Sequence, residues 1–521
     1  MDTKALRQKI LDLAIRGKLV PQDPNDEPAS VLLERIRAEK QQMVKDGKLK
    51  AKDIKNDTVI FKGDDNLHYE QFADGTVKCI EDEIPFELPD GWAWVRINTA
   101  CIINPRNNID DNTEVSFVPM ANISEGYANS FVSDSRLWRK VKTGYTHFAD
   151  NDIGIAKITP CFENKKSVVF TGLINGYGAG TTELHIIRTI SGLIVPEYLL
   201  CFAKRNDFIL GGVQTFSGDV GQQRVTKDYI ANYLFSLPPL NEQKRIISAI
   251  KEAYYIIENI EKTKLSLIED VNKAKSKILD LAIRGKLVPQ NPNDEPASVL
   301  LERIRAEKEE LIKQGKIKRD KKESVIFKDD DNSYYQDLPD NWVNIKLSTI
   351  SEVITKGTTP RGGKVAYADN GIGFLRAENI AGYDKLDLNN LNYVDEKSHN
   401  NFLKRSILKA NDILITIAGT LGRTAVVPSE ALPLNTNQAV AIVRLVNCKL
   451  VNVKFIIFAI NSPTIKKDLL MQSVDMAIPN LSLENISNCT IPLPPLSEQE
   501  RIVNAVETLF AQIDKISEQI L

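Results

Sequence analysis

The chain has 521 residues, too many for a single hydrophobic core, and this length indicates roughly three to four structural units. A hydrophobic share of 42% and a charged share of 26% are ordinary for a globular protein. The net charge of −2 excludes a chain that is basic throughout, so any nucleic-acid surface must be local.

The N-terminal stretch MDTKALRQKILDLAIRGK (1–18) carries charges along its length, so it is not a signal peptide. No apolar run approaches the roughly 20 residues that a membrane-spanning helix needs. The cysteines form no CxxC pair and the four histidines are scattered singly, which predicts reduced thiols and no metal site. Together these features predict a cytoplasmic protein without a membrane segment.

Long stretches of the sequence occur twice. Residues 9–40 and 277–308 are identical at 31 of 32 positions, with Asp23 replaced by Asn291. Packing alone does not demand such identity, because protein cores tolerate extensive apolar exchange. Three shorter pairs follow in the same order, namely TVIFKGDD (58–65) and SVIFKDDD (324–331), LPDGW (88–92) and LPDNW (338–342), and LPPLNEQKRIISAI (237–250) and LPPLSEQERIVNAV (493–506).

The repeats separate shared helical regions from two unlike blocks. We predict an α+β fold in which two mixed α/β blocks are separated by long antiparallel coiled-coil helices in a circular pseudo-two-fold arrangement. The predicted parts are a helical region with a linker (1–84), the first block (85–236), a central helical region with a linker (237–337), the second block (338–492) and a C-terminal helix (493–521).

A long helix is predicted at the centre of the chain. Apolar residues recur there in alternating steps of four and three, which is the period of a coiled-coil seam. Asn241 is a candidate N-cap and Gly285 a candidate stop, so the helix is placed over 241–285. The predicted seam consists of Ile246, Ile250, Ile257, Ile260, Leu267, Val271, Ile278 and Leu281, and it recurs at Ile502, Val506, Leu509 and Ile513.

The two ends of the chain match the two halves of this helix. Residues 497–521 match its first half and begin with Ser497 and Glu500 as a candidate capping box, whereas residues 1–17 match its second half. We therefore expect both terminal segments to form helices that lie antiparallel against the central one. A Pro-rich connector and a second amphipathic helix, starting near Pro28 or Pro296, are predicted to follow.

The two blocks differ in sequence but show the same mixture of elements. Stretches such as SVVFTGLI (167–174) and NQAVAIVRLV (437–446) alternate or run apolar at strand length. One short helix is predicted in each block, over 196–210 and 452–470.

Polar and basic side chains gather in the predicted loops of both blocks. Arg and Lys suit phosphates and guanine edges, and Asn and Gln suit adenine edges, although a solvated loop surface is the alternative interpretation. The candidate DNA contacts are Arg136, Arg139, Lys140, Lys157, Asn164, Lys165, Lys166, Gln222, Gln223 and Arg224 in the first block, and Lys356, Thr358, Thr359, Arg361, Lys364, Arg376, Asn379, Arg423, Asn437 and Gln438 in the second.

Catalytic motifs are weak throughout the chain. GTTPRGGKV (357–365) lacks the spacing and the Ser/Thr of a phosphate-binding loop. Asp152, Glu163 and Lys165 fit a loose arrangement found in metal-dependent nucleases, but the corresponding stretch 412–423 lacks the Glu and the Lys. The residues favour a binding protein over an enzyme. A coiled-coil scaffold for two protein partners and a stand-alone nuclease are the alternatives.

The layout resembles the specificity subunit of type I restriction–modification systems. The resemblance covers essentially the whole chain and is carried by LPPLNEQKRI (237–246) and LPPLSEQERI (493–502) after the blocks, LPDGW and LPDNW before them, and ILDLAIRGKLVPQ on the helices. It implies that each block is a target-recognition domain for one half of a bipartite, asymmetric site in double-stranded DNA. The helices would set the spacing between the halves.

The resemblance also implies partners for the chain. Two methyltransferase subunits would dock on the helices, bind S-adenosylmethionine and methylate adenine, and restriction subunits that use ATP and Mg²⁺ would join them. The chain itself would bind no cofactor and catalyse no reaction. The near-identity of 9–40 and 277–308 motivates a further hypothesis, that recombination exchanges one block for another.

Overall fold

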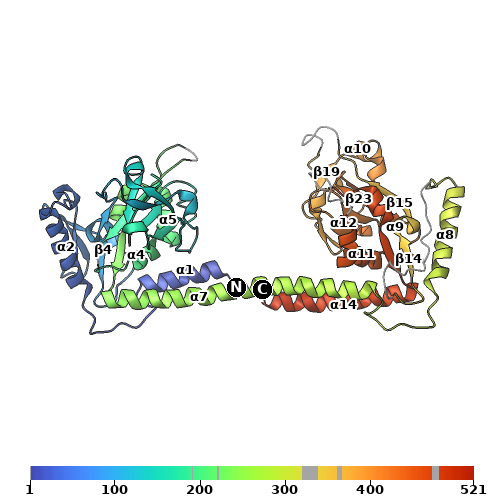
Figure 1. Cartoon of the computed structure of the whole chain (residues 1–521), viewed down its shortest axis with the longest axis horizontal. Coiled ribbons are helices and arrows are strands. Elements are labelled where there is room, and N and C mark those ends of the chain that lie inside the picture. The colour runs from blue at the N-terminus through green and yellow to red at the C-terminus, as the bar shows by residue number, and fades with distance from the viewer. Residues whose placement is uncertain are drawn as a thin grey trace. The chain divides into compact units, whose positions relative to one another are not determined.

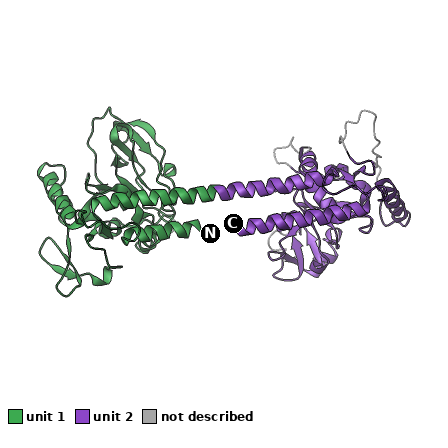
Figure 2. Cartoon of the chain, turned by 90° about the horizontal axis from the view of Figure 1, so that it is seen from below, with its two compact units in different colours: residues 1–262 green, residues 263–521 purple. Residues whose placement is uncertain are grey.

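The computed structural model describes residues 2–190, 192–219, 222–319, 338–360, 367–471 and 480–520. The chain forms two compact units, Met1–Lys262 and Thr263–Leu521, which Figure 2 shows in green and purple. Helix α7 (Leu240–Ile283) supplies its first half to one unit and its second half to the other. The repeat copy at 324–331 lies outside the described residues.

A pair of long helices supports the first unit, and we call these helices and their counterparts in the second unit the rods. Helix α1 (Thr3–Ile15) lies along the first half of α7, and Arg7 donates hydrogen bonds of 2.8 and 3.0 Å to the carboxylate of Glu261 (Figure 1). Beyond the other end of α1, Gln22 donates to Glu242 near the start of α7. The two helices therefore run antiparallel, as predicted.

The second unit repeats this arrangement with its own segments. Helix α14 (Leu496–Ile520) lies along the second half of α7, and the ammonium of Lys275 lies 2.5 Å from Asp514 (Figure 1). Gln290 after α7 hydrogen-bonds to Glu498 at the start of α14. The expectation that both chain ends form helices lying antiparallel against the central helix is confirmed within each unit.

A glycine ends the helix that leads into each connector. Gly17 and Gly285 have φ of 63° and 64°, the left-handed region that disfavours side chains. A Cβ at these positions would lie 2.4 Å from Pro89 and 2.5 Å from Pro339. The predicted stop at Gly285 is confirmed for both the conformational and the steric reason.

The predicted start signals are less accurate. Helices α7 and α14 begin at Leu240 and Leu496, ahead of the expected Asn241 cap and within the LPPL motifs. Ser497 lies inside the helix, and its hydroxyl donates to Asp294 of the connector at 2.8 Å. The predicted capping box is therefore wrong, because the connector takes the serine hydroxyl.

The side of α7 that is buried changes along the helix. Ile246, Ile250 and Ile257 are buried in the first unit as the seam predicts. Farther along, Leu279, Ala282 and Ile283 are buried because they pack into the core of the second block, while Ile278 and Leu281 are only half-buried. Among the other predicted seam residues, Ile502 and Val506 are buried, and Ile260, Leu267, Val271, Leu509 and Ile513 are half-buried.

A second helix follows each connector. Helices α2 (Ala29–Lys45) and α8 (Ala297–Lys313) begin directly after Pro28 and Pro296, close to the predicted positions. Lys40 on α2 is buried and donates to the carbonyls of Asn98 and Thr99, and Lys308 on α8 donates to the carbonyl of Ser348. The duplicated lysine therefore fastens this helix to the first turn of each block.

The first block is built on two four-stranded sheets, ordered β10-β9-β12-β5 and β7-β6-β11-β8. Strand β11 runs parallel to β6, whereas the other pairs are antiparallel. The first strand of the block, β4, pairs with its last strand, β13. The bounds are β4 (Ala93–Arg96), β5 (Cys101–Ile103), β6 (Glu114–Val118), β7 (Asp134–Leu137), β8 (Thr146–Ala149), β9 (Ile153–Ala156), β10 (Ser167–Val169), β11 (Tyr177–Gly180), β12 (Leu184–Thr189) and β13 (Leu234–Leu237).

The second block has a closely similar topology although its sequence differs, with three strands in place of four in its second sheet among the described residues. Its sheets are ordered β21-β20-β23-β15 and β19-β16-β22, β22 runs parallel to β16, and β14 pairs with β24. A small hairpin, β17 with β18, is added. The bounds are β14 (Val343–Lys346), β15 (Ser351–Lys356), β16 (Ile372–Leu375), β17 (Ile380–Gly382), β18 (Lys385–Leu386), β19 (Asn392–Val394), β20 (Ile413–Thr416), β21 (Thr424–Val426), β22 (Leu434–Thr436), β23 (Val440–Leu445) and β24 (Thr490–Leu493).

Two short helices stand in each block where one was predicted. The chain is extended between the two helices of each pair, at Arg205 in the first block and at Ser462 in the second. In the second block Pro463 has no backbone N–H to donate, so the first helix of the pair cannot continue past this point. The pairs are α4 (Pro196–Ala203) with α5 (Asn206–Gln214), and α11 (Val453–Asn461) with α12 (Pro463–Met471). The remaining α-helices are α3 (Ile97–Ala100), α6 (Lys227–Asn232), α9 (Leu347–Ile350), α10 (Glu396–Asn400) and α13 (Leu483–Asn488).

A small antiparallel sheet stands between α2 and the first block. It consists of β1 (Val59–Lys62), β2 (His68–Gln71) and β3 (Val77–Cys79). Glu70 on β2 is buried and accepts hydrogen bonds from Thr58 and from Arg96 on β4. This sheet therefore joins the linker to the first strand of the block.

Candidate nucleic-acid interface

Three duplicated motifs meet at one carboxylate in each unit. In the first unit the indole Nε1 of Trp92 and the amide of Gln22 each donate to Glu242 at 3.0 Å. In the second unit Trp342 and Gln290 donate to the corresponding Glu498. Connector, block start and rod are thus joined by the same contacts in both units. The duplicated sequence fixes the frame, and the rest of each block is free to differ.

A buried ion pair occupies the same place in both blocks. Asp152, 1% exposed, accepts hydrogen bonds of 2.8 and 2.7 Å from Arg188 and one from the backbone N–H of Ala149. Asp412 accepts in the same way from Arg444 and from the N–H of Lys409. Burial raises the pKa of Asp152, and the hydrogen bonds from Arg188 oppose that rise.

This ion pair overturns the nuclease alternative. Asp152 is committed to Arg188, and Lys165 is held by the side chain of Asn206 at 2.6 Å, so the proposed Asp–Glu–Lys set has no free metal-binding carboxylate at Asp152. Within the described ranges, no group of three His, Cys, Asp or Glu side chains is placed to hold a metal ion. The same ranges contain no helix long and apolar enough to cross a membrane.

The first block brings four of the predicted contacts together at the turn between β11 and β12. Arg224 forms a bidentate ion pair with Glu183 of this turn, at 2.8 and 2.9 Å. The backbone N–H of Lys157 donates to the backbone carbonyl of Glu183, and the backbone carbonyl of Gln223 accepts from the N–H of Thr159. Hydrogen bonds from Arg224 lower the pKa of Glu183, so its carboxylate stays charged. We call Lys157, Glu183, Gln222, Gln223 and Arg224 the first turn site.

The second block brings predicted contacts together at the equivalent turn, between β22 and β23. The backbone of Thr358 bonds to Thr436, and Gly357 approaches so closely that a Cβ would lie 2.1 Å from the carbonyl oxygen of Asn437. This close approach explains why glycine stands at the first position of GTTPRGGKV. We call Lys356, Thr358, Arg405, Asn437 and Gln438 the second turn site; Lys356, Arg405 and Gln438 are exposed in it.

Arg405 was missed by the sequence analysis. Its Nε donates to the hydroxyl of Thr358 at 2.9 Å from a position 47 residues away in the chain. The only local signal is the basic pair of Lys404 and Arg405. This pair does not indicate that Arg405 lies beside Thr358, which follows the end of β15.

Several other predicted contacts lie away from the turn sites. Arg136 stacks on Phe117 with its guanidinium 3.5 Å from the ring centre, and Arg139 donates to Asn112. Arg136 lies on β7, and Arg139 and the exposed Lys140 lie in the short 3-10 helix Trp138–Lys140 that follows this strand. Thr359 is half-buried beside the second turn site, and Arg361 and Lys364 lie outside the described residues.

Some predicted contacts serve the interior of the blocks. Asn379 is buried, and its amide bonds the backbones of Arg376, Asp387 and Asn390, so its side chain is committed to the interior of the block in this structure. Other predicted residues contact groups of their own block, namely Lys165 with Tyr127 and Asn206, Lys166 with the Met120 carbonyl, the Asn164 carbonyl with the Gly126 N–H, Arg376 with Glu378, and Arg423 with the Ile380 carbonyl.

Known proteins resemble this chain over nearly its whole length. Residues 89–270 and 339–521 match the family described as type I restriction modification DNA specificity domain. The chain is 34% identical to the type I restriction enzyme EcoAI specificity subunit of Escherichia coli, over 98% of this chain and 90% of that protein. It is 33% identical to the EcoEI specificity subunit of Escherichia coli, over 99% of this chain and 90% of that protein.

A solved structure has the same fold. This structure comes from work described as the structural basis underlying complex assembly and conformational transition of the type I R-M system. It superposes on this chain with a TM-score of 0.56. The match covers 84% of this chain and 94% of that chain at 19% sequence identity.

Two blocks of closely similar topology, joined to rods through duplicated contacts and carrying unlike polar turns, define a protein with two recognition domains. The chain belongs to the type I restriction–modification DNA specificity family. It is a DNA specificity subunit of a type I system, a non-catalytic member of the complex with two target-recognition domains. The resemblance drawn from the sequence is confirmed.

Proposed function

We propose that the first block (85–236) and the second block (338–492) each recognise one half of a bipartite, asymmetric site in double-stranded DNA. The observation that carries this proposal is the equivalence of the two turn sites. Both lie at the turn that leads into an inner strand, β12 or β23, of the sheet β10-β9-β12-β5 or β21-β20-β23-β15, which we call the main sheet of each block. The two domains, which share one fold, would then present equivalent surfaces to DNA.

The turn sites differ in chemistry, which supports unlike half-sites. The first offers Lys157, Arg224 and the carboxylate of Glu183, and a carboxylate accepts hydrogen bonds from cytosine. The second offers Lys356, Arg405 and the amides of Asn437 and Gln438, which suit adenine. For the first block we propose in addition that Glu183 and Arg224 give up their ion pair when DNA binds and contact bases and phosphates instead.

The proposed partners follow from the duplication. Residues 9–40 and 277–308 present nearly the same side chains in each unit, which supports the docking of two copies of one methyltransferase subunit. In this proposal those subunits bind S-adenosylmethionine and methylate adenine, and restriction subunits use ATP and Mg²⁺. This chain contributes recognition and spacing.

The test is to co-express the chain with its methyltransferase subunit and to map methylated adenines across a genome. Gln438→Ala is expected to relax or change the bases of one half-site only, and Gln222→Ala those of the other half-site only. Gln41→Ala on α2, an exposed amide away from both turn sites, serves as the control and leaves the motif unchanged. If both turn variants methylate the unaltered motif with unaltered efficiency, the turn sites do not contact the bases.

A further inference from the structure

Each block packs on the near-identical segments and, in addition, on a part of the rods that lies outside them. In the first unit this part is residues 240–258 of α7, and in the second unit it is residues 496–514 of α14. The two stretches correspond because each begins within a duplicated LPPL motif. Their sequences differ at many positions, so the side chains that face the blocks differ as well.

One ion pair between block and rod is reversed in charge between the units. Lys251 of α7 lies 3.4 Å from Glu197, the second residue of α4. The position that corresponds to Lys251 is Glu507 of α14, and it pairs with Lys454, the second residue of α11. The acid stands on the block in the first unit and on the rod in the second.

An aromatic contact beside the ion pair is shared by both units. Tyr127 packs edge to face on Tyr254 of α7 with ring centres 6.1 Å apart, and Tyr383 packs in the same way on Phe510 of α14 at 6.0 Å. The position of the block on the rod is therefore alike, while the charge beside it is not. A first block docked on α14 would place Glu197 opposite Glu507, and like charges at this distance repel.

Among the described residues, a second contact is found in the first unit without a counterpart in the second. Gln8 of α1 donates to the hydroxyl of Tyr127 and to the carbonyl of Lys204, and it accepts from the N–H of Asn206, each at 2.8 Å. Gln8 directly precedes the near-identical segment, and the corresponding residue in the second unit is Ser276. The shorter side chain of serine does not span these three groups.

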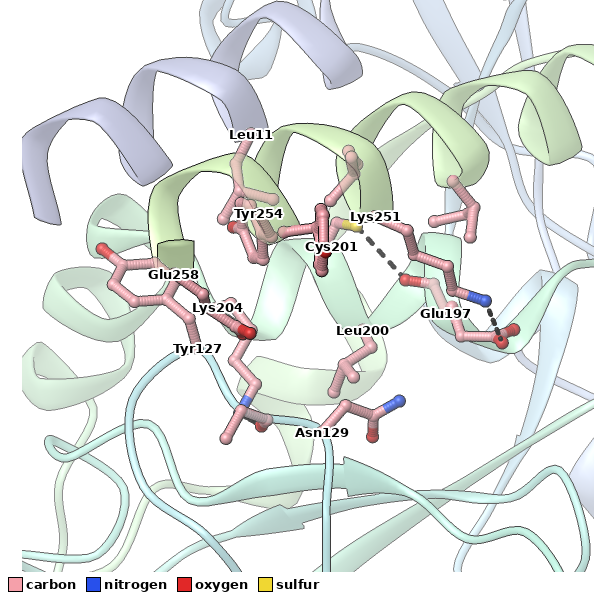
Figure 3. A pocket seen from close by; sticks show the side chains of 14 residues that line it. Leu11, Tyr127, Asn129, Glu197, Leu200, Cys201, Lys204, Lys251, Tyr254 and Glu258 are labelled. Carbon is pink, nitrogen blue, oxygen red and sulfur yellow. Dashed lines mark hydrogen bonds and ion pairs between the residues drawn. The ribbon is translucent and has the colours of Figure 1, made fainter. Parts of the chain in front are cut away.

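The surface between the first block and its rods is incompletely filled. A pocket of about 280 Å³ lies there, lined by α4, α7, Leu11 of α1 and residues 127–129 (Figure 3). Figure 3 shows the Lys251–Glu197 pair on one side of the pocket and Tyr127 on the other. Because apolar packing is interrupted here, the polar contacts around the pocket carry more of the discrimination between rods.

We propose that Glu197 with Lys251, and Lys454 with Glu507, match each recognition domain to the rod segment that follows it in the chain. Gln8 extends the match in the first unit. Exchange of a block between the two positions, or between related chains, then requires residues 240–258 or 496–514 to travel with it. The partner that this surface fits is the chain's own following helix, and the inference holds whichever bases the blocks recognise.

Charge reversal in the full-length chain tests the match directly. Lys251→Glu and Glu197→Lys should each speed amide hydrogen exchange in α4 and in residues 127–129 by about threefold, because like charges then face each other. The double variant recreates the polarity of the second unit and should return the rate close to that of the unaltered chain. Lys262→Glu, an exposed change of the same charge on the same helix, is the control. Single variants without effect, or a double variant no better than the singles, overturn the proposal.

A graft separates matching from simple stability. Residues 85–236 are placed where 338–492 stand, so that the first block faces α14. Its α4 is expected to exchange several-fold faster than in its own place, and Glu507→Lys should recover most of the protection. Glu500→Lys, an exposed change on the same helix, should recover none. A grafted block that is fully protected without Glu507→Lys, or equally rescued by Glu500→Lys, contradicts the match.

Discussion

The Asp–Arg pair is the polar contact that the two blocks share inside their main sheets. Asp152 and Asp412 are fully buried, and each also fixes a backbone N–H three residues earlier in the chain. Removal of one partner leaves a charge without compensation in a low-dielectric interior, which costs about 3 kcal/mol or more. We therefore expect Arg188→Met to lower the free energy of unfolding by about 3 kcal/mol, measured by urea denaturation, and Arg444→Met to act similarly.

The matched control for that prediction is Arg224→Met. Arg224 also forms a bidentate pair, with Glu183, but its side chain is 38% exposed. Solvent screens this pair, so the expected loss is below about 1 kcal/mol. Equal losses for Arg188→Met and Arg224→Met would contradict a special role for the buried position.

The rod pair of the first unit gives a prediction on pH. Hydrogen bonds from Arg7 lower the pKa of Glu261 from its ordinary value of 4.5 to about 2. A carboxyl whose pKa is lower in the folded chain stabilises the fold above its unfolded pKa, and this stabilisation is lost as the pH falls from about 4.5 toward 2. Glu261→Gln should therefore lower stability at pH 7 and have a shrinking effect between pH 5 and pH 3.

Denaturant titrations at several pH values measure this difference. Glu252→Gln, an exposed change on the same helix, should show no such narrowing as the pH falls. A stability difference between Glu261→Gln and the unaltered chain that is constant from pH 7 to pH 3 would rule out the ion pair as its source.

At the scale of elements, the contacts between connector, block start and rod depend on one indole in each unit. Trp92→Phe removes the donor to the buried Glu242 while keeping most of the apolar volume. A hydrogen bond to a charged, buried acceptor is worth about 1.5–3 kcal/mol, and we expect a loss of that size in the first unit. Trp342→Phe should have the same effect through Glu498.

Trp94 provides the control within the same strand region. Its indole N–H is buried, and no acceptor for it is found among the described residues. Trp94→Phe therefore removes no hydrogen bond and should cost less than Trp92→Phe in the same unfolding assay. The opposite order would show that ring volume, and not the Glu242 contact, governs stability at this junction.

The elements also show what sequence reasoning finds and misses. The rod helices and their glycine stops follow from local rules, because period, caps and left-handed glycines are written in adjacent residues. The buried face of the second half of α7 does not follow from local rules, because Leu279 and Ile283 are buried by the second block, which lies far along the chain. The positions of Arg405 and Asn379 escape local rules for the same reason, because tertiary contacts decide which loop residue faces a strand end and which is buried.

For the whole molecule, the central feature is that one continuous helix belongs to both units. The first half of α7 pairs with α1 and the second half with α14, as Arg7–Glu261 and Lys275–Asp514 show. The duplicated contacts of each unit are complete without residues from the other. A change of length near residues 262–263 should therefore leave both units intact.

Insertion of seven residues between Lys262 and Thr263 tests the proposed role of α7 in spacing. Seven helical residues add about 10.5 Å and rotate the following part by only about 20° from its former register. At about 3.4 Å per base pair, the gap between the half-sites should grow by about three base pairs while the bases of each half stay the same. Genome-wide mapping of methylated adenines measures the gap directly.

The control insertion is placed where the rods are not lengthened. Seven residues after Gly47, an exposed turn at the end of α2 with no atom near its missing Cβ, should leave the gap unchanged. Loss of methylation in both variants would indicate damage to the complex, which urea denaturation of each variant checks separately. An insertion in α7 that preserves methylation with the original gap would contradict spacing by the rod, because a longer continuous helix has then changed no distance along the DNA.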